Sequence, residues 1–203
     1  DQFGEAMVHL QEAVALDPAL AHAQMNLGLA LAARGESRAA IRRYRKAIAI
    51  RPTYAEAWNN LGAELAAVGE ASEAARHFRE ALKIKPNYAD AHLNLGLLRA
   101  SEGRGDEALA HYREALRIDP ENEKGYYNLG VAAFSEGSYD EAVAYFREAL
   151  RIHPNFAEAH LNLGILLETR GNPAEAGIRF RRALEINPEY ARAREQLTAL
   201  EPD

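Results

Sequence analysis

Prolines recur along this chain at a fixed interval of 34 residues. Six of the eight prolines follow this spacing: Pro18, Pro52, Pro86, Pro120, Pro154 and Pro188. A fixed period of this size is typical of proteins built from stacked copies of one small structural unit. The spacing therefore predicts a repeat protein.

Small and aromatic residues keep the same register as the prolines. Glycine occurs in two such series, which are Gly28, Gly62, Gly96, Gly130 and Gly164, and then Gly35, Gly69, Gly103, Gly137 and Gly171. An aromatic residue lies between two series of alanines, at Tyr44, Phe78, Tyr112, Phe146 and Phe180. We expect the first glycine of each repeat where two helix axes approach closely, with the aromatic ring filling the space between neighbouring units.

These series divide the chain into units, all within one predicted domain that spans residues 1–203. The five complete repeats are 21–54, 55–88, 89–122, 123–156 and 157–190. Residues 1–20 are predicted to form the second helix of a truncated unit, and residues 191–203 a C-terminal capping helix. The start at Asp1 also indicates that this sequence is a segment of a longer protein.

Each repeat is predicted to contain two helices of about 13 residues, which are too short to be stable alone in water. The second glycine permits the chain to reverse between the two helices. The proline ends the second helix, because it lacks a backbone N–H and biases the preceding residue away from helical geometry.

One repeat carries the residues of a known family at the family's spacing. Residues 55–88 contain Trp58, Leu61, Gly62, Ala74, Phe78, Ala81 and Pro86. This pattern resembles the tetratricopeptide repeat (TPR). The resemblance implies an all-α fold, a right-handed superhelical solenoid of antiparallel helix pairs, in which the first helices line a concave groove. It also implies a scaffold for protein assembly.

Composition and charge disfavour several classes of function. The formal net charge of −6 offers no general attraction to nucleic acid or to anionic lipid. No apolar run approaches the roughly 20 residues needed to cross a bilayer. The absence of cysteine excludes disulfides and thiolate chemistry, and it leaves the cellular compartment open. We predict no binding of nucleic acid and no insertion into a membrane.

Catalytic and metal-ligating residues are not expected. His92 and His160 occupy the position that holds Trp58 and Tyr126 in other repeats, so they are interpreted as packing or surface residues. Equivalent residues of different units lie too far apart to share a metal ion, whose nitrogen ligands lie about 2 Å from it. We therefore predict no catalytic site, no metal site and no cofactor.

The densest run of basic residues falls in or beside the predicted second helix of the first repeat. Its members are Arg34, Arg38, Arg42, Arg43, Arg45, Lys46 and Arg51. Second helices face mainly outward in this family, so the run is interpreted as a solvated outer face. A local patch for an acidic partner or for nucleic acid is the alternative.

The sixth position of every complete repeat is asparagine: Asn26, Asn60, Asn94, Asn128 and Asn162. Asparagine is a mediocre helix former, so its recurrence calls for a reason. A ladder of amides can donate to and accept from the backbone of an extended peptide, and this ladder resembles the peptide-holding arm of the O-linked N-acetylglucosamine transferases. The alternative is that the amides join adjacent repeats.

Apolar residues surround the amides in the third to fifth repeats, on the predicted groove face. They are Leu93, Leu97, Tyr127, Val131, Phe134, Leu161 and Ile165. An exposed apolar strip on a protein surface typically marks an interaction site. We therefore expect a protein or peptide partner that is extended and carries apolar side chains, unless neighbouring units cover part of the strip.

The sequence thus predicts a non-catalytic interaction scaffold that binds a peptide or protein segment in its groove. Two alternatives remain at this stage. The chain could be the substrate-recruiting arm of a larger enzyme, or a structural module that assembles with copies of itself end to end.

Overall fold

The computed structural model describes residues 2–200, with side chains from residue 4 onward, and this part of the chain consists of α-helices joined by short turns. The helices are α1 (Gln2–Leu16), α2 (Ala21–Ala33), α3 (Ser37–Ile50), α4 (Ala55–Ala67), α5 (Ala71–Ile84), α6 (Ala89–Ser101), α7 (Gly105–Ile118), α8 (Glu123–Ser135), α9 (Tyr139–Ile152), α10 (Ala157–Thr169), α11 (Pro173–Ile186) and α12 (Ala191–Leu200). The predicted all-α class is confirmed.

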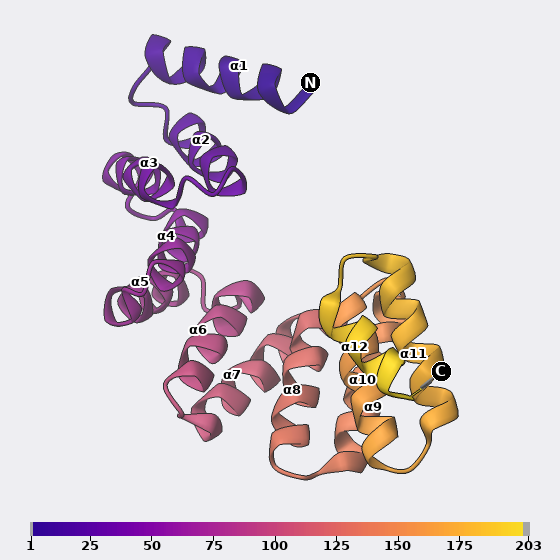
Figure 1. Ribbon diagram of the computed structural model, residues 1–203. Helices are drawn as coiled ribbons and strands as arrows, with labels where there is room; N and C mark the ends of the chain where they lie inside the picture. The colour runs from indigo at the N-terminus through magenta and orange to yellow at the C-terminus, as the bar shows by residue number, and fades with distance from the viewer. Residues whose placement is uncertain (1, 201–203) are drawn as a thin grey trace. The chain divides into compact units, whose positions relative to one another are not determined.

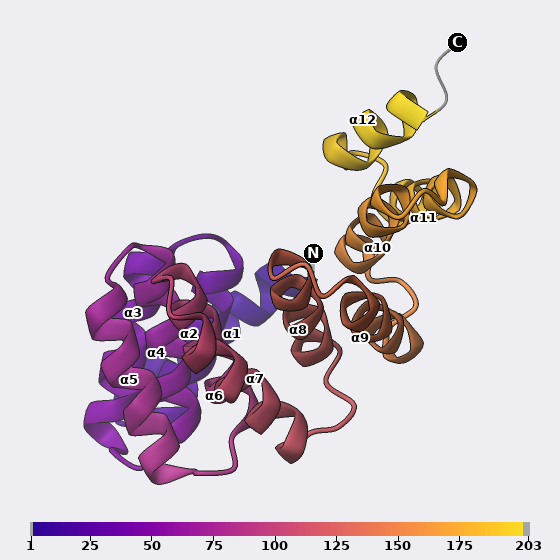
Figure 2. The same ribbon diagram turned by 90° about the horizontal axis from the view of Figure 1, so that it is seen from below.

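The helices form two compact units, residues 1–104 and residues 105–203. In the first unit, α2 packs antiparallel to α3 and α4 to α5 (Figure 1). In the second unit, α8 pairs with α9 and α10 with α11, and α12 packs on α11 (Figure 2). The antiparallel helix pairs predicted from the 34-residue period are therefore present in each unit.

A glycine facing an aromatic ring brings the two helices of a pair close together. A Cβ atom placed on Gly62 of α4 would lie 2.7 Å from the ring of Phe78 in α5, and one on Gly130 of α8 would lie 2.7 Å from the ring of Phe146 in α9. Both rings are almost completely buried. Only glycine leaves room for such an approach, as the sequence predicts.

Alanines complete the close packing of the second helices. Ala74 and Ala81 in α5, and Ala142 and Ala149 in α9, have no exposed surface. Their small side chains let neighbouring helices approach without leaving cavities. The core of each unit is thus a repeated layer of alanines around one large ring.

The second glycine series lies in the turns between paired helices, in left-handed backbone geometry. Gly69, between α4 and α5, has a φ of 87°, and its N–H donates to the carbonyl of Ala66 at 3.1 Å. A residue with a Cβ pays a penalty of roughly 1–2 kcal/mol in this region. The reversal between the helices therefore depends on glycine.

We expect Gly69→Ala to lower the free energy of unfolding by about 1–2 kcal/mol, from the steric cost of positive φ alone. No atom lies within 4 Å of the position that its Cβ would take, so packing contributes nothing. Urea denaturation followed by circular dichroism measures the change. An unchanged midpoint would contradict this account of the turn.

The last helix covers the end of the second unit's core. Ala193 of α12 is fully buried, and Leu197 and Leu200 are half-buried against that core. Residues 201–203 of the predicted capping helix, and Asp1 of the predicted first segment, lie outside the described residues. Within the described part, no helix has the length and apolar character needed to cross a membrane.

Candidate functional site

The five recurring asparagines lie on the first helices, one each on α2, α4, α6, α8 and α10. Asn26 is exposed, whereas the other four are half-buried. Half-buried amides usually have a hydrogen-bond partner, so the partners decide between the two functions considered for this series.

Three of the amides bond within the chain. The Nδ2 of Asn94 donates to Oδ1 of Asn59 at 3.0 Å, and the Nδ2 of Asn162 donates to the hydroxyl of Tyr127 at 2.9 Å. Asn60 Nδ2 makes a weaker contact, at 3.9 Å, with the sulfur of Met25. Each acceptor lies 35 residues earlier, at the fifth position of the preceding repeat. These three amides therefore join adjacent repeats.

The two other asparagines differ from these three. Within the described part of the chain, the side chains of Asn26 and Asn128 make no hydrogen bond. Among the described residues, the amides of Asn26 and Asn128 are thus unbonded.

Two residues of the predicted apolar strip are not available to a partner. Leu93 of α6 is only 4% exposed, and Leu161 of α10 is 1% exposed and belongs to the core of the second unit. Both occupy the fifth position of their repeats, where the chain itself covers a leucine side chain. The assignment of these two leucines to a binding surface was wrong.

The remaining apolar residues keep exposed surface. Leu97, on α6 in the first unit, is 47% exposed. In the second unit, Tyr127, Val131, Phe134 and Ile165 are half-buried and pack against the edge of the core. Each can therefore lose further apolar surface to a bound partner.

Tyr127 is held in place by its aromatic and polar neighbours. Its ring lies 4.9 Å from that of Phe156 and 6.0 Å from that of Phe146, between ring centroids. Burial raises the pKa of the Tyr127 hydroxyl, while the hydrogen bond from Asn162 lowers it in part. The hydroxyl therefore stays protonated at neutral pH, accepts from Asn162 and retains its own donor.

An apolar depression lies between α1 and α2 of the first unit, beside one of the unbonded amides. Its volume is ≈ 630 Å³. It is lined by Ala6, His9, Leu10, Asn26, Leu29, Ala30 and Ala33. Leu29 is 45% exposed there, so an apolar side chain of another molecule can contact it while Asn26 supplies a hydrogen bond.

Sequence reasoning missed a second polar series, at the fourth position of the repeats. Trp58 Nε1 donates to the carbonyl of Pro52 at 2.8 Å, and His160 Nε2 donates to the carbonyl of Pro154 at 3.0 Å. Three more residues make the same contact with the carbonyl of the proline six residues earlier: Gln24, His92 and Arg194. These side chains differ in type, but each carries a nitrogen donor and each lies six residues after the proline.

This series explains the histidines at the fourth position. A carbonyl only accepts hydrogen bonds, so Nε2 of His160 carries the proton. Burial lowers the pKa of His160, and the bond to Pro154 raises it in part. The interpretation of His92 and His160 as structural residues agrees with these contacts.

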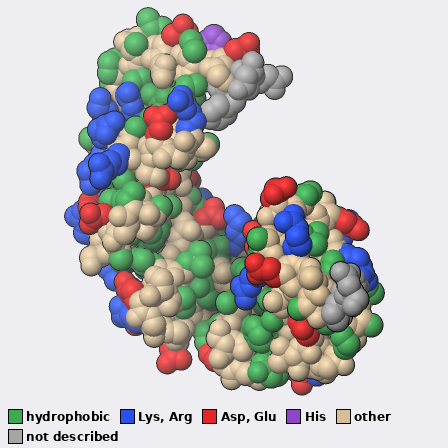
Figure 3. Space-filling model, viewed as in Figure 1, with side chains coloured by type: hydrophobic (Ala, Val, Ile, Leu, Met, Phe, Trp, Pro, Cys, Tyr) green, Lys and Arg blue, Asp and Glu red, His purple; other side chains and the backbone are tan. Residues whose placement is uncertain are grey.

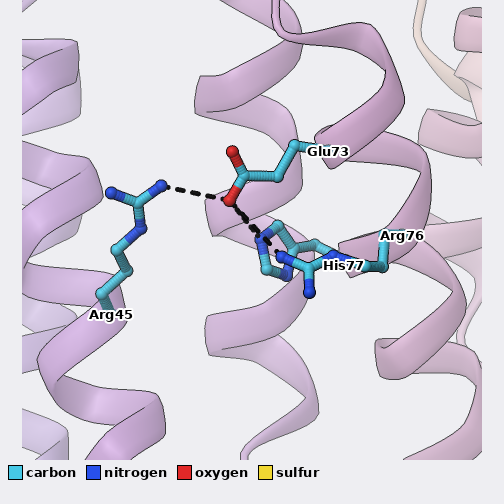
Figure 4. A network of polar contacts seen from close by, with 4 residues as sticks. All are labelled: Arg45, Glu73, Arg76 and His77. Atoms are coloured by element: carbon cyan, nitrogen blue, oxygen red, sulfur yellow. Dashed lines mark hydrogen bonds and ion pairs between the residues drawn. The ribbon is translucent and has the colours of Figure 1, made fainter.

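A four-residue polar network links α3 and α5 on the side of the second helices (Figure 4). Oε1 of Glu73 lies 3.1 Å from a guanidinium nitrogen of Arg45, 3.5 Å from one of Arg76 and 3.3 Å from Nε2 of His77. Its hydrogen bond to His77 is the main cause that lowers the pKa of Glu73. The carboxylate of Glu73 therefore joins two repeats, through Arg45 of α3 and His77 of α5.

In the part of the chain that the structure describes, no cluster of three or more histidine, aspartate or glutamate residues has an arrangement suited to a metal ion. The chemistry that the first-helix surface offers is therefore hydrogen bonding by amides and burial of apolar surface. Both suit the recognition of a polypeptide.

Sequence models of one family match most of the chain. A model of the TPR repeat matches residues 30–69, 64–103 and 96–136, and a model of the tetratricopeptide repeat matches residues 127–191. A sequence search of curated proteins found no match.

Solved structures with the same fold span different biological settings. The chain superposes on a protein chain of the APC/C hetero-tetramer Cut9-Hcn1 with a TM-score of 0.91 and 19% sequence identity. The match covers 98% of this chain and 40% of that chain. PilW, a type IV pilus biogenesis factor, gives a TM-score of 0.80 and 23% identity, over 98% of this chain and 90% of that one. YrrB, described as a TPR protein with an unusual peptide-binding site, gives a TM-score of 0.61 and 22% identity, over 92% of this chain and 96% of that one. At these identities the likeness establishes the fold alone.

Proposed function

Because the chain belongs to the tetratricopeptide repeat family, we propose that it is a non-catalytic scaffold that binds an extended peptide segment on its first helices. Proteins of this family typically mediate protein–protein interactions. The proposal adds the surface, the chemical character of the partner and the residues that hold it.

One observation carries the proposal: on α8, the unbonded amide of Asn128 lies about one helical turn from the half-buried apolar side chain of Val131. Positions three or four residues apart share a helix face, and residues Asn128 and Val131 have this spacing. A peptide lying there would meet a hydrogen-bonding group for its backbone beside apolar surface for its side chains.

The expected strength of such contacts is moderate. Fully burying one large apolar side chain is worth about 1.5–3 kcal/mol, and these residues are already half-buried. Several of them must therefore contribute together, which favours an extended partner over a single inserted side chain. Asn26 and Leu29 supply the same combination of amide and apolar surface in the first unit.

Similarities to two other kinds of TPR protein support this choice of surface. The likeness of the asparagine series to the peptide-holding arm of the O-linked N-acetylglucosamine transferases points to the first helices. The peptide-binding site named for YrrB shows that a protein of this fold can hold a peptide. For this chain we assign the hydrogen bonds to the peptide to Asn26 and Asn128. The amides of Asn60, Asn94 and Asn162 already bond within the chain.

A comparison of two asparagine variants tests the proposal. Peptides are first selected from a random library against the 203-residue chain, and the affinity of the best one is measured by fluorescence anisotropy. We expect Asn128→Ala to weaken binding about two- to tenfold without lowering the melting temperature, because a net hydrogen bond is worth about 0.5–1.5 kcal/mol.

Asn162→Ala is the matched control. It should lower the free energy of unfolding by about 1 kcal/mol, because it removes the bond to Tyr127, and change affinity less than Asn128→Ala does. Equal affinity for the Asn128→Ala variant and the unmodified chain would contradict the assigned hydrogen bond. If no peptide is selected at all, the proposed function itself fails.

A further inference from the structure

The helix α3 differs in charge from the equivalent helices of the other repeats. It carries five basic residues and no acidic one, whereas α5, α7, α9 and α11 each carry two or three acidic residues. The packing residues of α3, Ala40, Tyr44 and Ala47, are as deeply buried as their counterparts. The fold therefore does not require the extra positive charge, which Figure 3 shows gathered over α3 in the first unit.

An ion pair that joins neighbouring second helices is missing next to this helix. Arg45 of α3 pairs with Glu73 of α5 at 3.1 Å, and Arg147 of α9 approaches Glu175 of α11 at 3.7 Å. Both pairs join residues 28 positions apart. Between α1 and α3 the same two positions hold Gln11 and Ala39, which cannot form an ion pair.

A notch of about 180 Å³ lies at the place of the missing pair. Gln11 and Ala39 both line it, together with Leu27, Leu31, Arg42, Arg43 and Lys46. Its walls are cationic and its floor is apolar. Replacement of the arginine and glutamate by shorter side chains thus accounts for the opening, and Arg42 and Lys46 give it a positive charge.

Some of the basic side chains around the notch already form a hydrogen bond or ion pair within the chain, and others do not. Arg43 donates to Oε1 of Gln24 at 3.3 Å, and Arg34 pairs with Glu36 at 3.0 Å. Arg38, Arg42 and Lys46 are exposed, and no residue in the described part of the chain pairs with them. Three positive charges therefore face solvent beside an apolar opening.

We propose that this notch is a second interaction surface, distinct from the proposed peptide-binding surface, and that it binds an acidic segment of a partner protein. Carboxylates of the segment would pair with Arg42 and Lys46, and an adjacent small apolar side chain would contact the half-buried Ala39. Gln11 adds an amide that can bond to the backbone of the segment.

Charge and shape favour an acidic protein segment over a nucleic acid. With the five charges of α3 set aside, the formal net charge of −6 becomes −11, so a long polyanion would be repelled beyond this one helix. A floor made of leucine and alanine suits an apolar side chain better than a phosphate. No aromatic side chain lines the notch to stack on a base.

The test uses the 203-residue chain and a fluorescent peptide of about twelve glutamate and leucine residues. A peptide with glutamine in place of glutamate is the neutral probe. We expect the acidic probe to bind at least tenfold more tightly at about 50 mM salt, and to weaken as the salt rises and screens the charges.

Two variants locate the binding. Lys46→Glu introduces the residue that α5, α7 and α9 have at this position, and it should lower affinity for the acidic probe at least tenfold. Arg113→Glu makes the same change of charge at an exposed position of α7 and should leave affinity within about twofold, because Arg113 does not line the notch. The pair separates a local site from the effect of net charge.

The double variant Gln11→Arg with Ala39→Glu provides the sharpest comparison. It installs the ion pair of the other repeats, leaves the net charge unchanged and should fill the notch. We expect circular dichroism to show intact helices and the affinity to fall at least fivefold. Unchanged affinity in both this variant and Lys46→Glu, or tighter binding of single-stranded oligothymidine than of the acidic probe at equal salt, would overturn the proposal.

Discussion

Gly164→Ala is expected to lower the free energy of unfolding by about 1–3 kcal/mol, the usual cost of adding atoms to a tightly packed core. A Cβ on Gly164 would lie 2.5 Å from the ring carbon Cε1 of Phe180, and Phe180 has no exposed surface. The ring cannot move away, so α10 and α11 must separate. Urea denaturation followed by circular dichroism gives the change.

The same substitution elsewhere separates packing from helix propensity. Alanine is favoured over glycine inside a helix by up to about 1 kcal/mol. Gly4 of α1 is exposed, and its Cβ would meet no atom within 4 Å, so Gly4→Ala should be neutral or slightly stabilising. If Gly164→Ala behaved like Gly4→Ala, the close approach of α10 to α11 would not depend on the glycine.

His160→Leu is expected to lower the free energy of unfolding by about 1–3 kcal/mol, because it leaves the carbonyl of Pro154 without its donor. His160→Gln should cost less, because Gln24 makes the equivalent bond to the carbonyl of Pro18, at 3.0 Å. Both variants remove the imidazole ring, so the difference between their free energies of unfolding measures the contribution of the hydrogen bond. Equal stability of the two would show that the bond contributes nothing.

His160 should also make stability depend on pH. Burial lowers its pKa in the folded chain, so the unfolded chain binds a proton more readily. The stability is therefore full above the unfolded histidine pKa of about 6.5 and declines as the pH falls through it. We expect His160→Gln to reduce this decline between about pH 7.5 and 5.5, and His77, whose pKa burial also lowers, to account for part of what remains.

The fold could be predicted because each residue type acts locally and the pattern repeats. A glycine such as Gly62 permits the close approach, one such as Gly69 permits the reversal, and a proline such as Pro86 ends the helix. These requirements are properties of single residues in a fixed register. The sequence therefore predicts the helix pairs without knowledge of the long-range contacts.

The candidate surface could be predicted only in part, because exposure depends on neighbours that the sequence does not identify. Leu161 and Ile165 lie one turn apart on α10, yet the core covers Leu161 and leaves Ile165 half-exposed. The hydrogen bond of Asn162 depends on the residue 35 positions earlier, Tyr127, and the bond of Asn94 depends on Asn59 in the same way. One residue series therefore contains amides that bond within the chain and, among the described residues, amides that do not.

The donors to the proline carbonyls remained hidden for a different reason. Trp58, His160 and Arg194 share no size, charge or polarity class, and only their nitrogen donors are alike. A comparison of residue types along the repeats does not group them. The contact becomes visible once the structure places each donor beside the carbonyl six residues earlier.

The most direct measurement for the central claim compares two lysine substitutions in binding of the selected peptide. Val131→Lys places a charge on the proposed first-helix surface, and Ile178→Lys places one on α11, at an apolar residue that is 55% exposed. If the first helices hold the peptide, Val131→Lys weakens binding by about tenfold or more, which corresponds to about 1.4 kcal/mol, while Ile178→Lys leaves it unchanged. Equal affinity of the two variants, or a loss confined to Ile178→Lys, would contradict the account.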